Sequence, residues 1–144
     1  MTADEIIALL NLAPHPEGGH YRQTWEAPGP RSGTAEGRAA GTCIYFLLKA
    51  GERSHWHRVD AAEIWHFYAG APLVLSVAED QSGPRVDHAL GPDLATGQRP
   101  QIIVPEGHWQ AARTTGAWTL VGCTVSPGFR FEGFELASAD FDIP

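Results

Sequence analysis

Short runs of apolar or alternating residues fill most of the chain, and glycine or proline separates most runs from the next. Alternation with a period of two is typical of a β-strand that has one buried face. Many short strands between turn residues predict a sandwich or barrel of the all-β class, not a succession of β-α-β units. The runs are HYRQTWEA (20–27), TCIYFLLK (42–49), AEIWHFYAG (62–70), PLVLSVAE (72–79), PQIIVPEG (100–107), WTLVGCTVSPG (118–128) and FRFEGFEL (129–136).

One short helix is predicted, and it lies at the N-terminus. Thr2 and Glu5 have the spacing of a capping box, in which the threonine hydroxyl accepts from the backbone of Glu5 and the glutamate side chain reaches back. An apolar helical face follows over residues 6–10, and Asn11 and Pro14 end the helix. No pattern after Pro14 indicates another helix.

Two long segments, 27–41 and 78–100, are rich in glycine and proline and are predicted to be loops. The second has room for a short strand over Arg85–Leu90. Both are long enough to cover a functional site, although solvent-exposed hairpin tips account for such segments more often. Neither has the character of a domain linker, so we expect a single domain over residues 1–144.

The composition narrows the classes of function. Apolar residues make up 43% of the chain, which suffices for a hydrophobic core. The formal net charge of −7 argues against nucleic acid and anionic membrane as partners, and no apolar run reaches the roughly 20 residues that span a bilayer. The two cysteines, Cys43 and Cys123, stand in apolar runs and are expected to be buried thiols. A cytoplasmic protein without a signal peptide is therefore predicted.

The segment from Gly51 to Gly70 carries the densest potential chemistry. His55 and His57 are two residues apart, so a regular strand projects both from one face. We expect Glu63 to open the next strand and to lie opposite His57, with the two strands paired antiparallel. Two imidazoles and a carboxylate suit a divalent metal, and an imidazole that titrates near neutral pH also suits acid-base catalysis. The residues alone leave three interpretations open: metal ligands, metal-free binding or catalytic groups, and exposed or structural histidines.

Together with a second segment, this stretch resembles the cupin superfamily. The second segment, VPEGHWQAAR (104–113), places a turn before a strand, and Gln110 occupies the position of the histidine in the second cupin motif. The chain is similar in particular to a small uncharacterised cupin-like family, with which it shares P-E-G-G-x-Y-R (16–22), E-I-W-H-F-Y (63–68) and V-x-P-G-F (125–129). The resemblance implies a double-stranded β-helix, or jelly-roll, with a central ligand cavity, and it implies a homodimer. The first cupin motif is matched by Gly51, His55, His57, Glu63 and Gly70, and the second by Pro105 and Gly107.

The resemblance also implies a metal site. One divalent ion (Fe, Ni, Mn or Zn) would be held by His55, His57, Glu63 and Gln110. The glutamine departs from the family pattern, because an amide oxygen is a weaker ligand for these metals than an imidazole. In the metal-free alternative, Gln110 hydrogen-bonds a ligand or a neighbouring side chain.

Further residues are candidate ligand contacts. Tyr21 and Arg22 belong to the P-E-G-G-x-Y-R stretch, and an arginine suits a carboxylate or a phosphate. An ion pair between Arg22 and a glutamate that anchors the strand is the structural alternative. Trp65 and Phe67 share one face of their strand and either line the cavity or pack in the core. The full predicted ligand-binding set is Tyr21, Arg22, His55, Trp65, Phe67 and Gln110.

Two functions are consistent with these residues. The first is a small-molecule enzyme, an isomerase or epimerase or a metal-assisted enzyme, that acts on a sugar-like or other polar metabolite with His57 and Glu63 as catalytic groups. The metal-independent sugar-nucleotide epimerases of the same fold are its closest analogy, at the level of the fold only. The alternative is a non-catalytic cupin that binds a small molecule for sensing or storage.

Overall fold

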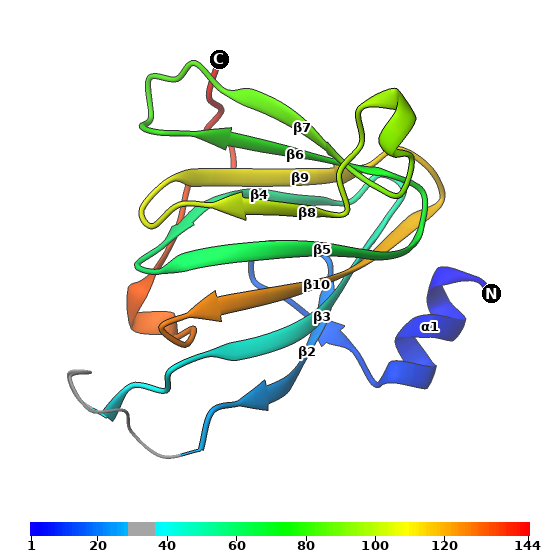
Figure 1. The fold of residues 1–144 in the computed structure, drawn as a ribbon, viewed down its shortest axis with the longest axis horizontal. Coiled ribbons are helices and arrows are strands. Elements are labelled where there is room, and N and C mark those ends of the chain that lie inside the picture. Colours follow the sequence, from blue (N-terminus) through cyan, green and yellow to red (C-terminus); the bar gives the residue numbers. More distant parts are fainter. Residues whose placement is uncertain (29–36) are drawn as a thin grey trace.

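The structure is a double-stranded β-helix, described for residues 1–28 and 37–144 by a computed structural model (Figure 1). In these residues one antiparallel sheet has the order β1-β2-β3-β10-β5-β8 and the other β11-β4-β9-β6-β7. The predicted all-β jelly-roll with one short N-terminal helix is confirmed. The first sheet contains β1 (Ala13–Pro14), β2 (His20–Glu26), β3 (Thr42–Lys49), β10 (Trp118–Ser126), β5 (Ala62–Gly70) and β8 (Gln101–Val104). The second contains β11 (Phe134–Leu136), β4 (Arg53–Val59), β9 (Trp109–Thr114), β6 (Leu73–Ala78) and β7 (Val86–Leu90).

The consecutive strands β4 and β5 lie in opposite sheets. β4 pairs with β9 and β11, whereas β5 pairs with β10 and β8. The predicted antiparallel pairing of these two strands is therefore wrong. Their short connection turns a buried corner, where Val59, Ala61 and Val125 pack together, and this corner carries the chain from one sheet to the other. As a result, His57 and Glu63 interact across the space between the sheets and not along one sheet.

The predicted N-terminal helix is present as α1 (Ala3–Leu10). Both hydrogen bonds of the capping box form: the Glu5 N–H donates to the Thr2 hydroxyl over 3.2 Å, and the Thr2 N–H donates to the Glu5 carboxylate over 3.0 Å. Asn11 ends the helix in the left-handed conformation, with φ of 56°. The apolar side of α1 packs with Leu47 on the outer face of the first sheet.

The strands follow the predicted runs closely where those runs are continuously apolar or alternate regularly. Residues 42–49 and 62–70 coincide with β3 and β5. The run 129–136 is a strand only at its end, as β11, because Phe131–Gly133 form a single helical turn.

The two predicted loops have different outcomes. The segment 78–100 contains β7, which matches the short strand expected there, and a single helical turn at Leu94–Thr96. Most of the segment 27–41 falls on residues 29–36, which lie outside the described residues.

The space between the sheets is divided into a packed half and an open half. On β5, Trp65 belongs to the apolar core, whereas Glu63 lines a cavity. On β3, Phe46 likewise belongs to the apolar core, and Thr42 lines the cavity. On these two strands, the inward-facing residue nearer the start of the strand lines the candidate site, and the one further along holds the sheets together.

Among residues 1–28 and 37–144, no helix has the length and apolar character that crossing a bilayer requires.

Candidate functional site

A cavity of about 490 Å³ occupies the open half of the barrel. Its polar wall includes His15, Glu17, His57, Glu63 and Cys123, and the rest of the wall is mainly apolar. These residues come from both sheets and from the turn between β1 and β2. The site therefore depends on the closure of the whole barrel.

The turn before β2 inserts Glu17 into the cavity. The turn is closed by hydrogen bonds from the His15 N–H to the Gly19 carbonyl (2.9 Å) and from the Gly18 N–H to the His15 carbonyl (3.0 Å). It lies directly on β4, because the Glu17 carbonyl accepts from the N–H of His55 over 2.8 Å. Gly18 and Gly19 have φ of 110° and 75°, and a side chain at Gly18 would collide with the β4 backbone. The two glycines thus permit the close approach that buries the Glu17 carboxyl.

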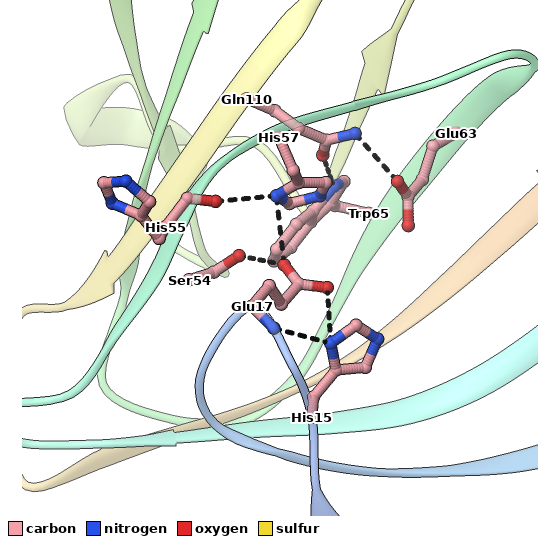
Figure 2. A network of polar contacts seen from close by, with 8 residues as sticks. All are labelled: His15, Glu17, Ser54, His55, His57, Glu63, Trp65 and Gln110. Atoms are coloured by element: carbon pink, nitrogen blue, oxygen red, sulfur yellow. Dashed lines mark hydrogen bonds and ion pairs between the residues drawn. The ribbon is translucent and has the colours of Figure 1, made fainter. Parts of the chain in front are cut away.

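The carboxyl group of Glu17 joins three side chains (Figure 2). One oxygen, Oε2, accepts a hydrogen bond from the Ser54 hydroxyl and lies 3.2 Å from Nδ1 of His57. The other oxygen, Oε1, lies 3.3 Å from Nδ1 of His15. Burial raises the pKa of Glu17 to about 8, and the hydrogen bond from Ser54 offsets only part of this rise.

His15 favours the protonated form of Glu17. The backbone N–H of Glu17 donates to Nδ1 of His15 over 3.1 Å, so this nitrogen holds a lone pair. Burial, with a smaller effect of His57, lowers the pKa of His15 to about 4, so the ring is neutral. This lone pair accepts from the Glu17 N–H and also lies 3.3 Å from Oε1, so it repels an ionised Oε1 and favours the protonated form of Glu17, as burial does. Glu17 is therefore a carboxylic acid at neutral pH.

His57 is also a neutral imidazole. Its Nδ1 lies 2.8 Å from the carbonyl oxygen of His55, and a carbonyl only accepts, so Nδ1 carries hydrogen. The side chain is 2% exposed, and burial lowers its pKa, although Glu63 partly opposes this shift. The second nitrogen, Nε2, then has its lone pair free to act as an acceptor.

Glu63 reaches the cavity from the opposite sheet. Its Oε1 accepts a hydrogen bond from the Gln110 amide over 2.8 Å, and the Cys123 thiol also donates to the carboxyl group. Burial raises the pKa of Glu63 to about 7, nearby His57 opposes the rise, and nearby Glu17 adds to it. The same burial raises the pKa of the Cys123 thiol well above its ordinary value, so the thiol remains a donor.

Gln110 and Trp65 fix the orientation of this carboxyl group. The indole N–H of Trp65 only donates, and it donates to Oε1 of Gln110 over 2.7 Å. The amide nitrogen must therefore point toward Glu63, as Figure 2 shows. Both side chains are almost completely buried, with 1% exposure each, and neither lines the cavity. Gln110 and Trp65 lie behind Glu63. The prediction that they contact a ligand is therefore not met, because such contacts require them at the cavity wall.

The predicted convergence of His55 with His57 is wrong. The pairing of β4 with β9 shifts its register between Ser54 and His57, as in a β-bulge, so both of these residues face the interior. The His55 ring points away from the cavity, and its Nε2 lies 2.7 Å from the carbonyl oxygen of Ser138 (Figure 2). The irregularity shifts the alternation of faces by one residue. The pairing of His57 with Gln110 on the adjacent strand agrees with the expected position of the glutamine.

The other predicted ligand contacts are divided. Tyr21 lines the cavity, with its ring centroid 4.4 Å from that of His15. Arg22 borders the cavity at the exposed strand β2, and its guanidinium carbon lies 6.0 Å from the ring centroid of Tyr45. Phe67 packs against the core cluster and does not line the cavity.

The predicted four-ligand metal set does not fit this geometry. His55 points out of the cavity, and the oxygen of Gln110 already accepts from Trp65. Only His57 and Glu63 remain from that set. In the part of the chain that the structure describes, no group of three or more histidine, cysteine or acidic side chains is arranged to hold a metal ion.

The sequence reasoning missed four members of the site. His15, Glu17, Ser54 and Cys123 all contact a buried carboxyl group or a buried imidazole. Of these four, only Glu17 could have been found from the sequence, because an acidic residue before two glycines fits a tight turn that projects a carboxyl group.

Comparison with known proteins agrees with this architecture. Residues 4–137 match the family described as "Cupin superfamily (DUF985)". Protein SO0799 from Shewanella oneidensis is 41% identical, with a TM-score of 0.87 over 96% of this chain and 85% of that one. A hypothetical protein from Leishmania major is 31% identical, with a TM-score of 0.86 over 96% of this chain and 88% of that one.

A more distant structure shares the fold alone. Oxalate decarboxylase from Bacillus subtilis is 12% identical, with a TM-score of 0.61 over 85% of this chain and 29% of that one. No curated protein matches the sequence.

Replacing Trp65 by phenylalanine tests the support behind Glu63. The change removes the donor to Gln110 but keeps a buried ring, so an amide oxygen is left unsatisfied at a cost of about 1–3 kcal/mol in the free energy of unfolding. Denaturant unfolding measures the loss. Trp25→Phe is the control, because Trp25 is exposed and its replacement should change stability by less than about 0.5 kcal/mol. Equal effects of the two changes would contradict the assigned role.

The buried ionisable groups predict how stability depends on pH. Because the pKa values of Glu17 and Glu63 rise from 4.5 to about 8 and about 7, the folded state holds protons that the unfolded chain releases, and stability falls as pH rises through this window. The lowered pKa of His15 (6.5 to about 4) acts oppositely, and stability rises with pH up to 6.5. Below pH 6.5 the effects of the glutamates and of His15 on stability oppose each other. A net loss of folding stability is therefore expected between pH 6.5 and about 8.

Glu17→Gln isolates the contribution of one carboxyl group. The variant has no proton to lose at this position, so its stability relative to the wild type should increase with pH, at up to about 1.4 kcal/mol per pH unit, until it levels off above about pH 8. Denaturant unfolding across the pH range gives the difference. A pH-independent difference would mean that Glu17 is already ionised in the folded protein.

Proposed function

We propose a function for this chain, which belongs to the family of the cupin superfamily described as DUF985. The protein acts as a metal-independent acid-base enzyme, an isomerase or epimerase, on a small uncharged compound that carries a carbonyl group and hydroxyl groups, as sugars do. Family membership supports the fold and the position of the cavity. Support for the reaction itself comes only from the side chains that line the cavity and from those that hold them.

One observation carries this proposal: two carboxyl groups with different partners meet a neutral imidazole at one buried cavity. General acid-base catalysis is most effective when the pKa values of the groups lie near the working pH. The pKa of Glu63 is about 7 and that of Glu17 about 8. In the interval between these values, an ionised Glu63 and a protonated Glu17 coexist, which supplies one base and one acid.

The proposed proton transfers are as follows. The Glu63 carboxylate removes a proton from the carbon next to the substrate carbonyl, and the electrons of the broken C–H bond form an enolate. Glu17 gives its proton to the enolate oxygen, which leaves an enol and a Glu17 carboxylate. In the second half, Glu17 takes the proton of the hydroxyl group on the neighbouring carbon as a new carbonyl forms there, and Glu63 gives its proton to the carbon that carried the original carbonyl, which yields the isomer. His57 supports the substrate by accepting a hydrogen bond from a hydroxyl group at Nε2.

Gln110 and Ser54 adapt the two carboxyl groups to these different roles. The Gln110 amide N–H donates to Glu63, and a hydrogen bond to the charged form favours a carboxylate. Glu17 faces the lone pair of His15, which favours its protonated form. Ser54 holds the other oxygen of Glu17 and fixes the direction of the acid. This asymmetry supports Glu63 as the base and Glu17 as the acid.

The character of the cavity supports an uncharged substrate. Phe129, Phe131 and Val125 provide apolar wall, against which the apolar face of a sugar-like ring can lie. The ionised form of Glu63 repels an anionic group at the buried end. Arg22 borders the exposed end and is available to parts of a ligand that extend to the cavity mouth.

A non-catalytic binding protein is the second candidate. It is favoured by the hydrogen bonds of Glu17, which are satisfied by Ser54, His57 and His15 without any ligand. Such a network also suits a rigid polar floor for a sensor or a storage protein. The homodimer and the cytoplasmic location stay predictions for either candidate.

Exchange of solvent deuterium into substrate carbon tests the catalytic proposal. Uncharged hydroxyketones and aldoses are first screened for binding by calorimetry, and exchange is then followed by proton NMR. We expect the exchange rate to have a maximum between about pH 7 and about 8, with a fall below from protonation of Glu63 and a fall above from ionisation of Glu17. Glu63→Gln should lower the rate at least about 100-fold.

Two histidine variants provide the matched comparison. His57→Ala should slow exchange, whereas His55→Ala should leave the rate unchanged because its ring points out of the cavity. A compound that binds in the cavity without any exchange would exclude the catalytic proposal and favour the binding protein. Equal losses in the two variants would contradict the assigned geometry.

A further inference from the structure

A second hollow lies on the outer face of the sheet that contains β4, β9, β6 and β7. It has a volume of about 180 Å³, and Arg53, Arg85 and Arg113 contribute to its lining. Ser76 and Ala111 are small side chains on the strands beneath it, which leaves space above the sheet. We call this feature the arginine hollow. It lies outside the barrel and shares no lining residue with the cavity between the sheets, which we call the catalytic cavity after its proposed function.

Two of these arginines are placed directly opposite each other. Arg53 of β4 and Arg113 of β9 are cross-strand partners in an antiparallel pair, an arrangement in which like charges are destabilising. Within the described ranges, 1–28 and 37–144, neither has a carboxylate at ion-pair distance. The fold therefore keeps two arginines opposite each other on a chain whose net charge is −7, and the only nearby carboxylate that interacts electrostatically with either of them in the described residues is Asp142, with Arg53.

Two acidic residues border the hollow, but neutral donors hold them. Asp87 accepts from the Ser76 hydroxyl over 2.6 Å, and Asp142 accepts from the indole N–H of Trp56 over 2.8 Å. Both carboxylates are only loosely paired with Arg85, with N–O separations of 3.5 Å for Asp87 and 3.8 Å for Asp142. A strong charge-assisted hydrogen bond is shorter, at roughly 2.7–2.9 Å. The lining thus retains an excess of positive charge and unused N–H donors.

We infer that the arginine hollow binds a phosphate group, either free phosphate or the phosphate of a small monoester. Planar guanidinium forks match the oxygens of a tetrahedral oxyanion, and donors from separate strands can approach it from several sides. Its binding would neutralise the Arg53–Arg113 contact, so the anion stabilises the folded state. This site complements the catalytic cavity, which disfavours anions.

Titration of the isotope-labelled protein with inorganic phosphate, followed by amide NMR shifts, tests this inference. Sodium chloride at matched ionic strength controls for screening. We expect saturable shifts for Arg53, Ser76 and Arg113, and none for Cys123 or Val125, which line the catalytic cavity from the opposite sheet. Thermal unfolding in the same solutions should show stabilisation by phosphate beyond that by chloride.

Variants locate the contribution of each guanidinium group. Arg53→Gln and Arg113→Gln should each weaken phosphate binding at least about tenfold, and Arg113→Lys should weaken it because a lysine lacks the planar fork. Without phosphate, Arg113→Gln should be at least as stable as the wild type, since it removes a like-charge contact. Arg58→Gln is the control on the same face, because Arg58 is paired with Glu135 and should not affect binding.

A comparison with glycerol phosphate distinguishes the two sources of the phosphate group. Equal affinity identifies the phosphate alone as the ligand, and tighter binding of the ester identifies a monoester. The inference is overturned if phosphate acts no differently from chloride, if the arginine variants bind as the wild type does, or if the shifts are confined to the catalytic cavity.

Discussion

The burial of two carboxyl groups, Glu17 and Glu63, between the sheets is the constraint on which the candidate site depends. Removing an ionised carboxylate from water is costly unless it is paired, and no arginine or lysine forms an ion pair with either group within the described part of the chain. The structure relieves the cost in two ways. Glu17 keeps its proton against the lone pair of His15, and Glu63 is surrounded by the Gln110 amide and the Cys123 thiol, both of which donate. Burial raises both pKa values toward neutral pH, and the donors to the two carboxyl groups offset only part of this rise.

This arrangement is possible because the barrel separates stability from chemistry along its strands. The residues that hold the sheets together, such as Phe46 and Trp65, lie at one end, and the carboxyl groups lie at the other. Trp65 belongs to both parts, since its ring packs in the core while its N–H orients Gln110. The apolar core therefore fixes the geometry of the polar site directly, through a single indole.

The sequence predicted the features that depend on local pattern and missed those that depend on tertiary contacts. The capping box of α1 and the strands β3 and β5 follow from short-range spacing, and the cupin resemblance identified the fold. The irregularity in β4 has no such signature, so the face of His55 was predicted incorrectly, whereas His57 faces the cavity as expected. Glu17 belongs to the P-E-G-G-x-Y-R stretch but was not assigned to the site, because its role requires the first turn to lie on β4, a contact between segments far apart in the chain.

The exchange of a cupin-motif histidine for Gln110 is best understood together with Trp65. A neutral imidazole has one acceptor nitrogen, which suits a metal ion. A glutamine has an acceptor and a donor at opposite sides of its amide, and Trp65 engages the acceptor, so the donor is committed to Glu63. The pair thereby converts a position for a metal ligand into a support for a carboxyl group. In this protein, one hydrogen-bonded pair both occupies the amide oxygen that the predicted metal set required and directs a donor to the buried carboxyl group of Glu63.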